Sequence, residues 1–421
     1  MIYYPKTNDI TKLKDMNVIF AINENIQNKS SKIKYFDNIE NFYEFIKTKK
    51  YTQKTKIAFI GNKKEIKDYA SLLEFIIYYK NTKQKIEKEM IKFNSFIKKD
   101  TNPIINDALD KFKYANSDGK CIRGTLINLG YNLHKKDNYA LKLCASYEAF
   151  ETSILIHDDI IDNSDLRRGK STIHKVYSKE FEKYNIDNTP TSLALCIGDI
   201  GFYYINEYIL NNYKKDKNII KLLNYYNNVV INTIKGEILD VYLSYIEKND
   251  KNHKLYEDDI MKIYKLKTSI YSIVGPFILG MILSNSKDKE IEKFENLLEP
   301  IGISFQIKDD ILGIFSDNNT IGKSVVSDIE EFKQTILYSY IKINKSEYLN
   351  DLLKLYGNRT NEKDLKKVQE IFITSGALEY AENKMNELFD ISKEKINNLI
   401  INSDFKNILL GLIIFLRHRK K

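Results

Sequence analysis

The chain has 421 residues, and its 43% hydrophobic content with only 5 prolines allows a sizeable core built largely from helices. Its net charge of +9 comes from basic residues scattered along the chain, which argues against a nucleic-acid partner and suits small anionic ligands. The sequence contains no run of eighteen apolar residues, so we expect no membrane-spanning helix. The cysteines (Cys121, Cys144 and Cys196) lack the spacing of metal ligands. Because they read as reduced thiols, we expect a cytoplasmic protein, with an organelle left open.

Residues 1–82 predict a small N-terminal appendage compatible with an α/β fold. The segments 17–22 and 56–61 have the apolar runs and turn signals of short buried strands, and 66–79 has the spacing of a helix. Residues 61–64 follow a strand as a phosphate loop does, but they lack its glycine spacing. We assign no role to this appendage.

From residue 83 to residue 421 the apolar residues recur mostly at spacings of three and four, which predicts a second, all-α domain. The predicted helices are 84–98, 103–115, 121–134, 138–162, 191–212, 217–246, 257–285, 288–315, 329–343, 345–356, 362–374, 376–401 and 404–418.

The first acidic motif lies near the end of the predicted helix 138–162. Asp158 and Asp162 are four residues apart, so their carboxylates share one helix face, and Asp159 lies beside them. Like charges this close repel unless a cation lies between them, and oxygen-only ligands favour Mg²⁺. Arg167 and Arg168 follow, and guanidinium groups suit phosphate. The motif therefore predicts a diphosphate site.

A second acidic motif lies near the end of the predicted helix 288–315. Asp309 and Asp310 repeat the pair, and Gly313 stands where a third aspartate would complete the match. A solvated helix face explains both motifs poorly, because their acids are embedded in apolar sequence and need partners or metal. Both motifs precede predicted loops, so we expect them at one mouth of a helical bundle.

Residues 84–421 resemble the trans-prenyl diphosphate synthases, the family of farnesyl and geranylgeranyl diphosphate synthases. The resemblance rests on the two acidic motifs and on further motifs that occur in the family's order along the chain. The further motifs are a basic segment at 118–124, the pairs Gly198-Asp199 and Lys267-Thr268, Gly322-Lys323 with Asp328 and Lys333, and a basic tail at 417–421. The resemblance implies an isoprenoid synthase bundle around a central cavity, a trans-prenyltransferase activity and a homodimer.

The resemblance also implies a role for each site residue. Mg²⁺ would be bound by the carboxylates of both motifs, which are Asp158, Asp159, Asp162, Asp309 and Asp310. The allylic diphosphate would be held by the cations Arg167, Lys267, Lys323 and Lys333. Isopentenyl diphosphate would lie against Lys120, Arg123, Glu151 and Arg168. The reaction centre would be lined by Lys267, Thr268 and Gln306.

Three positions depart from the family pattern. Asp118 replaces a glycine, Glu151 stands where His or Gln is usual, and Glu237 replaces a Gln. Carboxylates beside diphosphates are unfavourable unless they are protonated or paired with a cation. The changes leave open a catalytically silent subunit of a heteromeric synthase. A class I terpene cyclase is a further alternative, against which the paired aspartates of the second motif argue.

Product length in this family depends on side chains one or two turns before the first motif. Ser153 is small and lies one turn below Asp158, whereas the bulky Phe150 lies about one turn deeper. We therefore expect mainly geranylgeranyl diphosphate, and we expect Ser153→Phe to shorten the product to farnesyl diphosphate. Longer polyprenyl diphosphates are the alternative.

Overall fold

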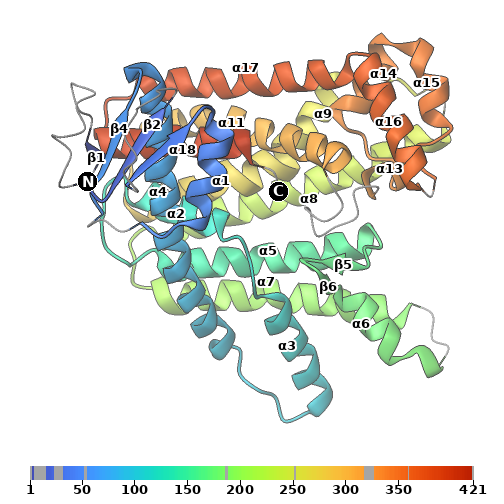
Figure 1. Cartoon of the computed structure of the whole chain (residues 1–421). Helices are drawn as coiled ribbons and strands as arrows, with labels where there is room; N and C mark the ends of the chain where they lie inside the picture. Colours follow the sequence, from blue (N-terminus) through green and yellow to red (C-terminus); the bar gives the residue numbers. More distant parts are fainter. Residues whose placement is uncertain are drawn as a thin grey trace. The chain divides into compact units, whose positions relative to one another are not determined.

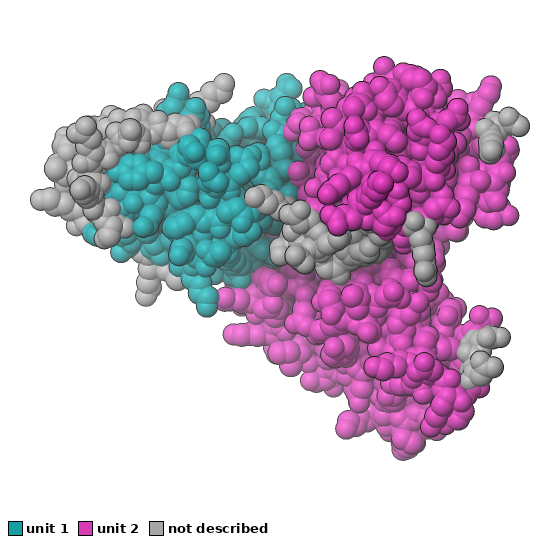
Figure 2. All heavy atoms as spheres, turned by 45° about the vertical axis from the view of Figure 1, so that its right-hand side comes forward, with its two compact units in different colours: residues 1–82, 389–419 teal, residues 83–388, 420–421 magenta. Residues whose placement is uncertain are grey.

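The computed structural model describes residues 2–3, 16–22, 32–51, 55–184, 188–250, 253–316, 327–358 and 360–419 (Figure 1). The predicted site residue Lys323 lies outside these residues. The chain forms two compact units, shown in different colours in Figure 2. Unit 1 comprises residues 1–82 and 389–419, and unit 2 comprises residues 83–388.

Unit 1 contains a parallel sheet of strand order β1-β4-β2-β3, so the α/β type predicted for the appendage is confirmed. Its strands are β1 (Ile2–Tyr3), β2 (Val18–Ile22), β3 (Ile33–Phe36) and β4 (Ile57–Ile60). The central strands β2 and β4 are apolar and almost wholly buried, as parallel strands covered on both faces are. The prediction missed the short strands β1 and β3 and the helix α1 (Ile39–Thr48).

The last helix, α18 (Ser403–His418), belongs to unit 1, although the sequence places it in the second predicted domain. Asn402 begins it by accepting hydrogen bonds from the Asp404 and Phe405 N–H groups. Gly411 lets α18 lie directly on helix α2 (Lys63–Phe96), where a Cβ would collide with the Ser71 carbonyl. The division into two domains after residue 82 stays a prediction.

Unit 2 is a helical bundle, as predicted. Helix α2 belongs to unit 2 from residue 83 onward, so the predicted helices 66–79 and 84–98 are one continuous helix. The other helices are α3 (Pro103–Ala115), α4 (Ile122–Tyr131), α5 (Leu141–Ile161), α6 (Ile173–Glu180), α7 (Thr189–Tyr213), α8 (Ile219–Asn249), α9 (Glu257–Ile263), α10 (Gly275–Leu283), α11 (Asp288–Phe315), α13 (Ser327–Glu330), α14 (Ile336–Asn344), α15 (Ser346–Leu353), α16 (Glu362–Thr374) and α17 (Ala377–Asn397), which continues into unit 1. Between the predicted helices 138–162 and 191–212 lie a hairpin of β5 (Leu166–Arg167) and β6 (Lys170–Ser171), the helix α6 and the 3₁₀ turn η2 (Glu182–Tyr184).

The predicted helix 257–285 is interrupted by a π-helix, η3 (Tyr264–Val274), between α9 and α10. Within the described residues, Glu257–Leu283 is the one segment long and apolar enough to cross a membrane, and 83% of its most apolar window is buried in the protein. This burial is what the core helix of a bundle requires.

Helices α5 and α7 lie side by side (Figure 1), and Gly201 of α7 allows their close contact. A Cβ at Gly201 would collide with Ser153 Oγ and with the Phe112 ring. Ser153 therefore fills the contact between α5 and α7, and it does not form an open level of a product cavity. In Ser153→Phe the added ring would meet α7 instead of a product cavity, so the structure gives no reason to expect a shorter product from this substitution.

Candidate active site

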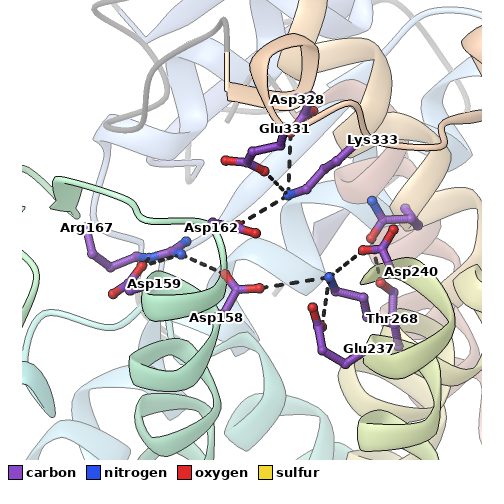
Figure 3. Close-up of polar contacts among 12 residues, drawn as sticks. Asp158, Asp159, Asp162, Arg167, Glu237, Asp240, Thr268, Asp328, Glu331 and Lys333 are labelled. Carbon is purple, nitrogen blue, oxygen red and sulfur yellow. Dashed lines mark hydrogen bonds and ion pairs between the residues drawn. The ribbon is translucent and has the colours of Figure 1, made fainter. Parts of the chain in front are cut away.

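The first acidic motif closes helix α5. Asp158 lies in its last turn and Asp162 is its C-cap, so both carboxylates stand where the helix dipole is negative. Arg167 returns from the hairpin and donates to Asp158 Oδ2 at 2.8 Å and, through Nε, to Asp159 Oδ1 at 2.7 Å (Figure 3). Asp159 is only 5% exposed, so Arg167 neutralises a buried charge.

Lys333 connects the first motif to the segment that follows the second. Its ammonium lies 3.3 Å from Asp162, 2.9 Å from Glu331 and 3.7 Å from Asp328 (Figure 3). Burial alone would lower the pKa of Lys333, but the Asp162 and Asp328 carboxylates raise it well above its usual value. Lys333 therefore remains a cation at the mouth of the bundle.

Lys267, from η3, is the third cation near the first motif. It lies 2.7 Å from Asp240, 2.8 Å from Glu237 and 3.9 Å from Asp158. Gly236 brings α8 onto η3, because a Cβ there would collide with the Lys267 backbone nitrogen. The Glu237 carboxylate, a departure from the family pattern, is thus paired with a lysine, although burial raises its pKa.

The second motif is anchored inside the bundle through Asp310. This carboxylate accepts hydrogen bonds from the Tyr264 hydroxyl and, at 2.8 Å, from Gln306 Nε2. Burial raises the pKa of Asp310 to about 8, against the two hydrogen bonds, which lower it. The Thr268 hydroxyl donates to Gln306 Oε1. Of the three side chains predicted to line the reaction centre, Thr268 and Gln306 therefore form one chain of hydrogen bonds that ends at Asp310, whereas Lys267 pairs with Asp240 and Glu237.

The π-helix η3 arranges this network. Tyr264 and Thr268 are four residues apart, close to one turn of a π-helix, so both reach α11, while Lys267 reaches α8. The Tyr264 hydroxyl also accepts the Ile336 N–H at 2.7 Å. Sequence reasoning missed Tyr264, because a tyrosine three residues before a lysine carries no recognisable signal.

A separate basic cluster forms around Glu151. Arg123 lies 2.8 Å from the Glu151 carboxylate, donates to Ser272 Oγ at 2.9 Å and stacks on the Tyr271 ring at 4.2 Å. Arg168 lies 3.3 Å from the same Glu151 oxygen and donates to the Ser117 carbonyl at 3.0 Å. Of the residues predicted for isopentenyl diphosphate, these three come together.

Lys120, the fourth of those residues, is exposed on the loop that leads to α4, and its charge helps to lower the pKa of Glu151. In the same loop Asp118 has φ +59°, a left-handed conformation that aspartate tolerates better than most residues. Its carboxylate lies 2.7 Å from Lys170. The substitution of the family's glycine therefore preserves the turn and adds an ion pair.

The donors of the first motif suit a hard divalent cation, because Asp158 and Asp162 present only oxygen from adjacent turns. In the part of the chain that the structure describes, no three acidic, histidine or cysteine side chains converge on one point. Ion pairs with Arg167, Lys267 and Lys333 engage the motif's oxygens instead. Asp309, in the second motif, is half-buried.

Comparison with known proteins identifies relatives of the chain. Residues 103–372, more than half of the chain, match the family model for polyprenyl synthetase. A short chain isoprenyl diphosphate synthase of Methanocaldococcus jannaschii is 28% identical over 350 residues, which cover 82% of this chain and 96% of the relative. A geranylgeranyl diphosphate synthase of Sulfolobus acidocaldarius is 26% identical over 68% of this chain and 83% of that relative.

The fold is shared with solved structures. The crystal structure of geranylgeranyl pyrophosphate synthase from Corynebacterium glutamicum, complexed with isoprenyl diphosphate and magnesium, matches with a TM-score of 0.72 at 22% identity. The match covers 82% of this chain and 99% of that one. It therefore includes almost the whole length of the Corynebacterium protein.

Replacing Tyr264 by Phe should lower the free energy of unfolding by about 1–3 kcal/mol, because the buried Asp310 loses a donor and the Ile336 N–H loses its acceptor. Urea unfolding measures this change. The matched control is Tyr184→Phe, at a ring 58% exposed, where we expect a change within about 0.5 kcal/mol. Equal effects of both substitutions would show that the Tyr264 hydroxyl is dispensable.

Proposed function

The chain belongs to the polyprenyl synthetase family of trans-prenyl diphosphate synthases, and we propose that it condenses isopentenyl diphosphate with an allylic diphosphate to make geranylgeranyl diphosphate. The observation that carries this proposal is the presence of two separate cationic clusters in unit 2. One is Arg167, Lys267 and Lys333 around the first aspartate motif, and the other is Arg123 and Arg168 around Glu151. Two clusters provide places for two diphosphates.

The first cluster would hold the allylic diphosphate. Mg²⁺ would be held there by Asp158, Asp162 and Asp309, with Asp159 and Asp310 in supporting positions, and would stabilise negative charge on the leaving diphosphate. Arg167, Lys267 and Lys333 add fixed positive charge at the same place, so they favour breakage of the allylic C–O bond.

The second cluster would hold isopentenyl diphosphate. Its double bond would attack the allylic carbon, forming the new C–C bond, and a proton would then leave the product. The buried rings of Tyr147, Phe150 and Tyr271, which pack together beside Arg123, would exclude water that could otherwise capture the carbocation. Glu151 and Glu237 are both paired with cations, and this pairing favours the catalytic assignment over the silent subunit.

The function is tested by incubating the protein with Mg²⁺, isopentenyl diphosphate and each of three allylic primers, followed by chromatography of the dephosphorylated products. Asp158→Ala should reduce turnover by about three orders of magnitude or more, since metal ions supply several kcal/mol to such reactions. The matched control is Asp165→Ala, at an exposed carboxylate paired with Lys175, which should keep its activity. An inactive wild type would favour the silent subunit, and hydrocarbon made from an allylic substrate alone would favour a cyclase.

Phe150 supports the proposed product length. Its ring is fully buried and lies 5.2–5.9 Å, between ring centroids, from four aromatic rings: Tyr147, Phe202, Tyr226 and Tyr271. These rings come from α5, α7, α8 and η3, about two turns of α5 below Asp158. We propose that this aromatic cluster stops the growing chain at geranylgeranyl diphosphate.

Phe150→Ala should lengthen the product by at least one isoprene unit, because it opens the aromatic cluster beneath the reaction centre. Chromatography of the dephosphorylated products measures the change. Phe112→Ala is the matched control, since this ring is equally buried but lies against Gly201 of α7. An unchanged product from Phe150→Ala, or the same lengthening from both variants, would show that the cluster does not set the length.

We also propose a homodimer formed through α7 and α8. Both helices carry large exposed apolar side chains, which are Leu195, Ile200, Tyr203, Leu210, Ile220, Ile231, Ile234, Ile238, Val241, Tyr242 and Tyr245. The spacing of those on α8 keeps them on one face. Sedimentation should show a dimer, which the double variant Ile238→Asp, Tyr245→Asp converts to monomers. Ile373→Asp, at an exposed isoleucine of α16, should leave it a dimer; a monomeric wild type contradicts the proposal.

A further inference from the structure

Glu151 lies between two arginines that come from distant parts of the chain. Its Oε1 is 2.8 Å from Arg123 Nη1, at the start of α4, and 3.3 Å from Arg168 Nη2, in the β5–β6 hairpin. Two guanidinium groups repel each other, so the carboxylate between them holds them side by side. Burial alone would raise the pKa of Glu151, but Arg123 and Arg168 outweigh burial and lower it. Glu151 is therefore charged at neutral pH.

Glu148 lies one turn earlier on α5 and is 2% exposed. Its Oε1 accepts the Gly124 N–H at 2.7 Å, directly after Arg123. Its other oxygen, Oε2, has no hydrogen-bond partner among the described residues, and Glu151 lies three residues further along the same helix, where i and i+3 side chains are neighbours. An oxygen without a donor can carry the proton itself and donate it to Glu151. Burial first, and the Glu151 charge second, raise the pKa of Glu148 to about 8.

The charged and titratable groups facing the pair come from several elements. The cations are Arg123, Arg168 and Lys120, and the neutral groups are the hydroxyls of Tyr147 and Tyr271 and the thiols of Cys121 and Cys144, whose pKa values burial raises. Helix α2 adds Lys83, Glu87 and Glu89, which act on those thiols. With one proton on the glutamates, the pair and its three cations carry a net charge of +2.

We propose that Glu148 and Glu151 are a positioning pair for isopentenyl diphosphate, which binds only while the pair holds one shared proton. The proposal rests on the function proposed above, because it takes Arg123 and Arg168 as the anchors of that substrate. Once the shared proton is lost to solvent, a second negative charge faces the incoming diphosphate. Substrate binding must then recover one proton from solvent. The neutral Gln common at position 151 in the family needs no such proton.

Calorimetry with isopentenyl diphosphate alone, without Mg²⁺, tests the proposal in two buffers of different protonation enthalpy. At pH 9 the wild type should take up about one proton per substrate bound, and its affinity should fall about tenfold between pH 7 and 9, the fall expected when one linked proton is lost. Glu148→Gln keeps a donor toward Glu151 and an acceptor for the Gly124 N–H. This variant should therefore bind the substrate without proton uptake, and its affinity should not change between pH 7 and 9. Asp165→Asn, at an exposed carboxylate paired with Lys175 outside both cationic clusters, should behave as the wild type does.

Steady-state kinetics separate positioning from a structural effect. The KM for isopentenyl diphosphate should rise about tenfold in Glu151→Ala, with kcat and the allylic KM little changed, because the arginines separate. Glu151→Gln keeps an oxygen between them and should restore tight binding. Absence of proton uptake by the wild type at pH 9, or uptake that persists in Glu148→Gln, overturns the proposal. Failure to make product with any primer overturns the proposed function instead, and the calorimetry still decides the role of the pair.

Discussion

The structure depends on the compensation of negative charge at one end of helix α5. Asp158, Asp159 and Asp162 crowd at the helix end where the backbone dipole is also negative, within an apolar core. Such a cluster is stable only with cations nearby. Arg167, Lys267 and Lys333 supply them from the hairpin, the π-helix and the segment after α13. The same concentration of carboxylates and fixed cations is what a metal-assisted diphosphate site requires.

The same rule explains the two carboxylates that depart from the family pattern. Glu237 is balanced by Lys267, and Glu151 by Arg123 and Arg168. Each lies in a different cluster, so in the proposed function each would change the charge presented to a different substrate. The pairing shows that an added acid is accommodated where a cation is already fixed.

The bundle holds these groups in place by close backbone contacts. Gly236 allows α8 to touch η3, which brings Glu237 and Asp240 to Lys267. Gly201 allows α7 to touch α5, which assigns Ser153 to the helix contact and leaves Phe150 facing the aromatic cluster. The positions of the side chains proposed to bind the metal and to limit the product therefore depend on how the helices are rotated about their axes as well as on which residues they carry.

The sequence by itself determined the helical type of unit 2, the strands β2 and β4, and the position of both aspartate motifs at helix ends. These features depend on local periodicity, which is written in neighbouring residues. The tertiary structure alone decided that Tyr264 holds Asp310, that Lys333 meets Asp162 across 171 residues, and that Glu148 and Glu151 support two arginines. Such contacts depend on the register and rotation of packed helices, and periodicity along one helix carries no information about the register or rotation of the helix beside it.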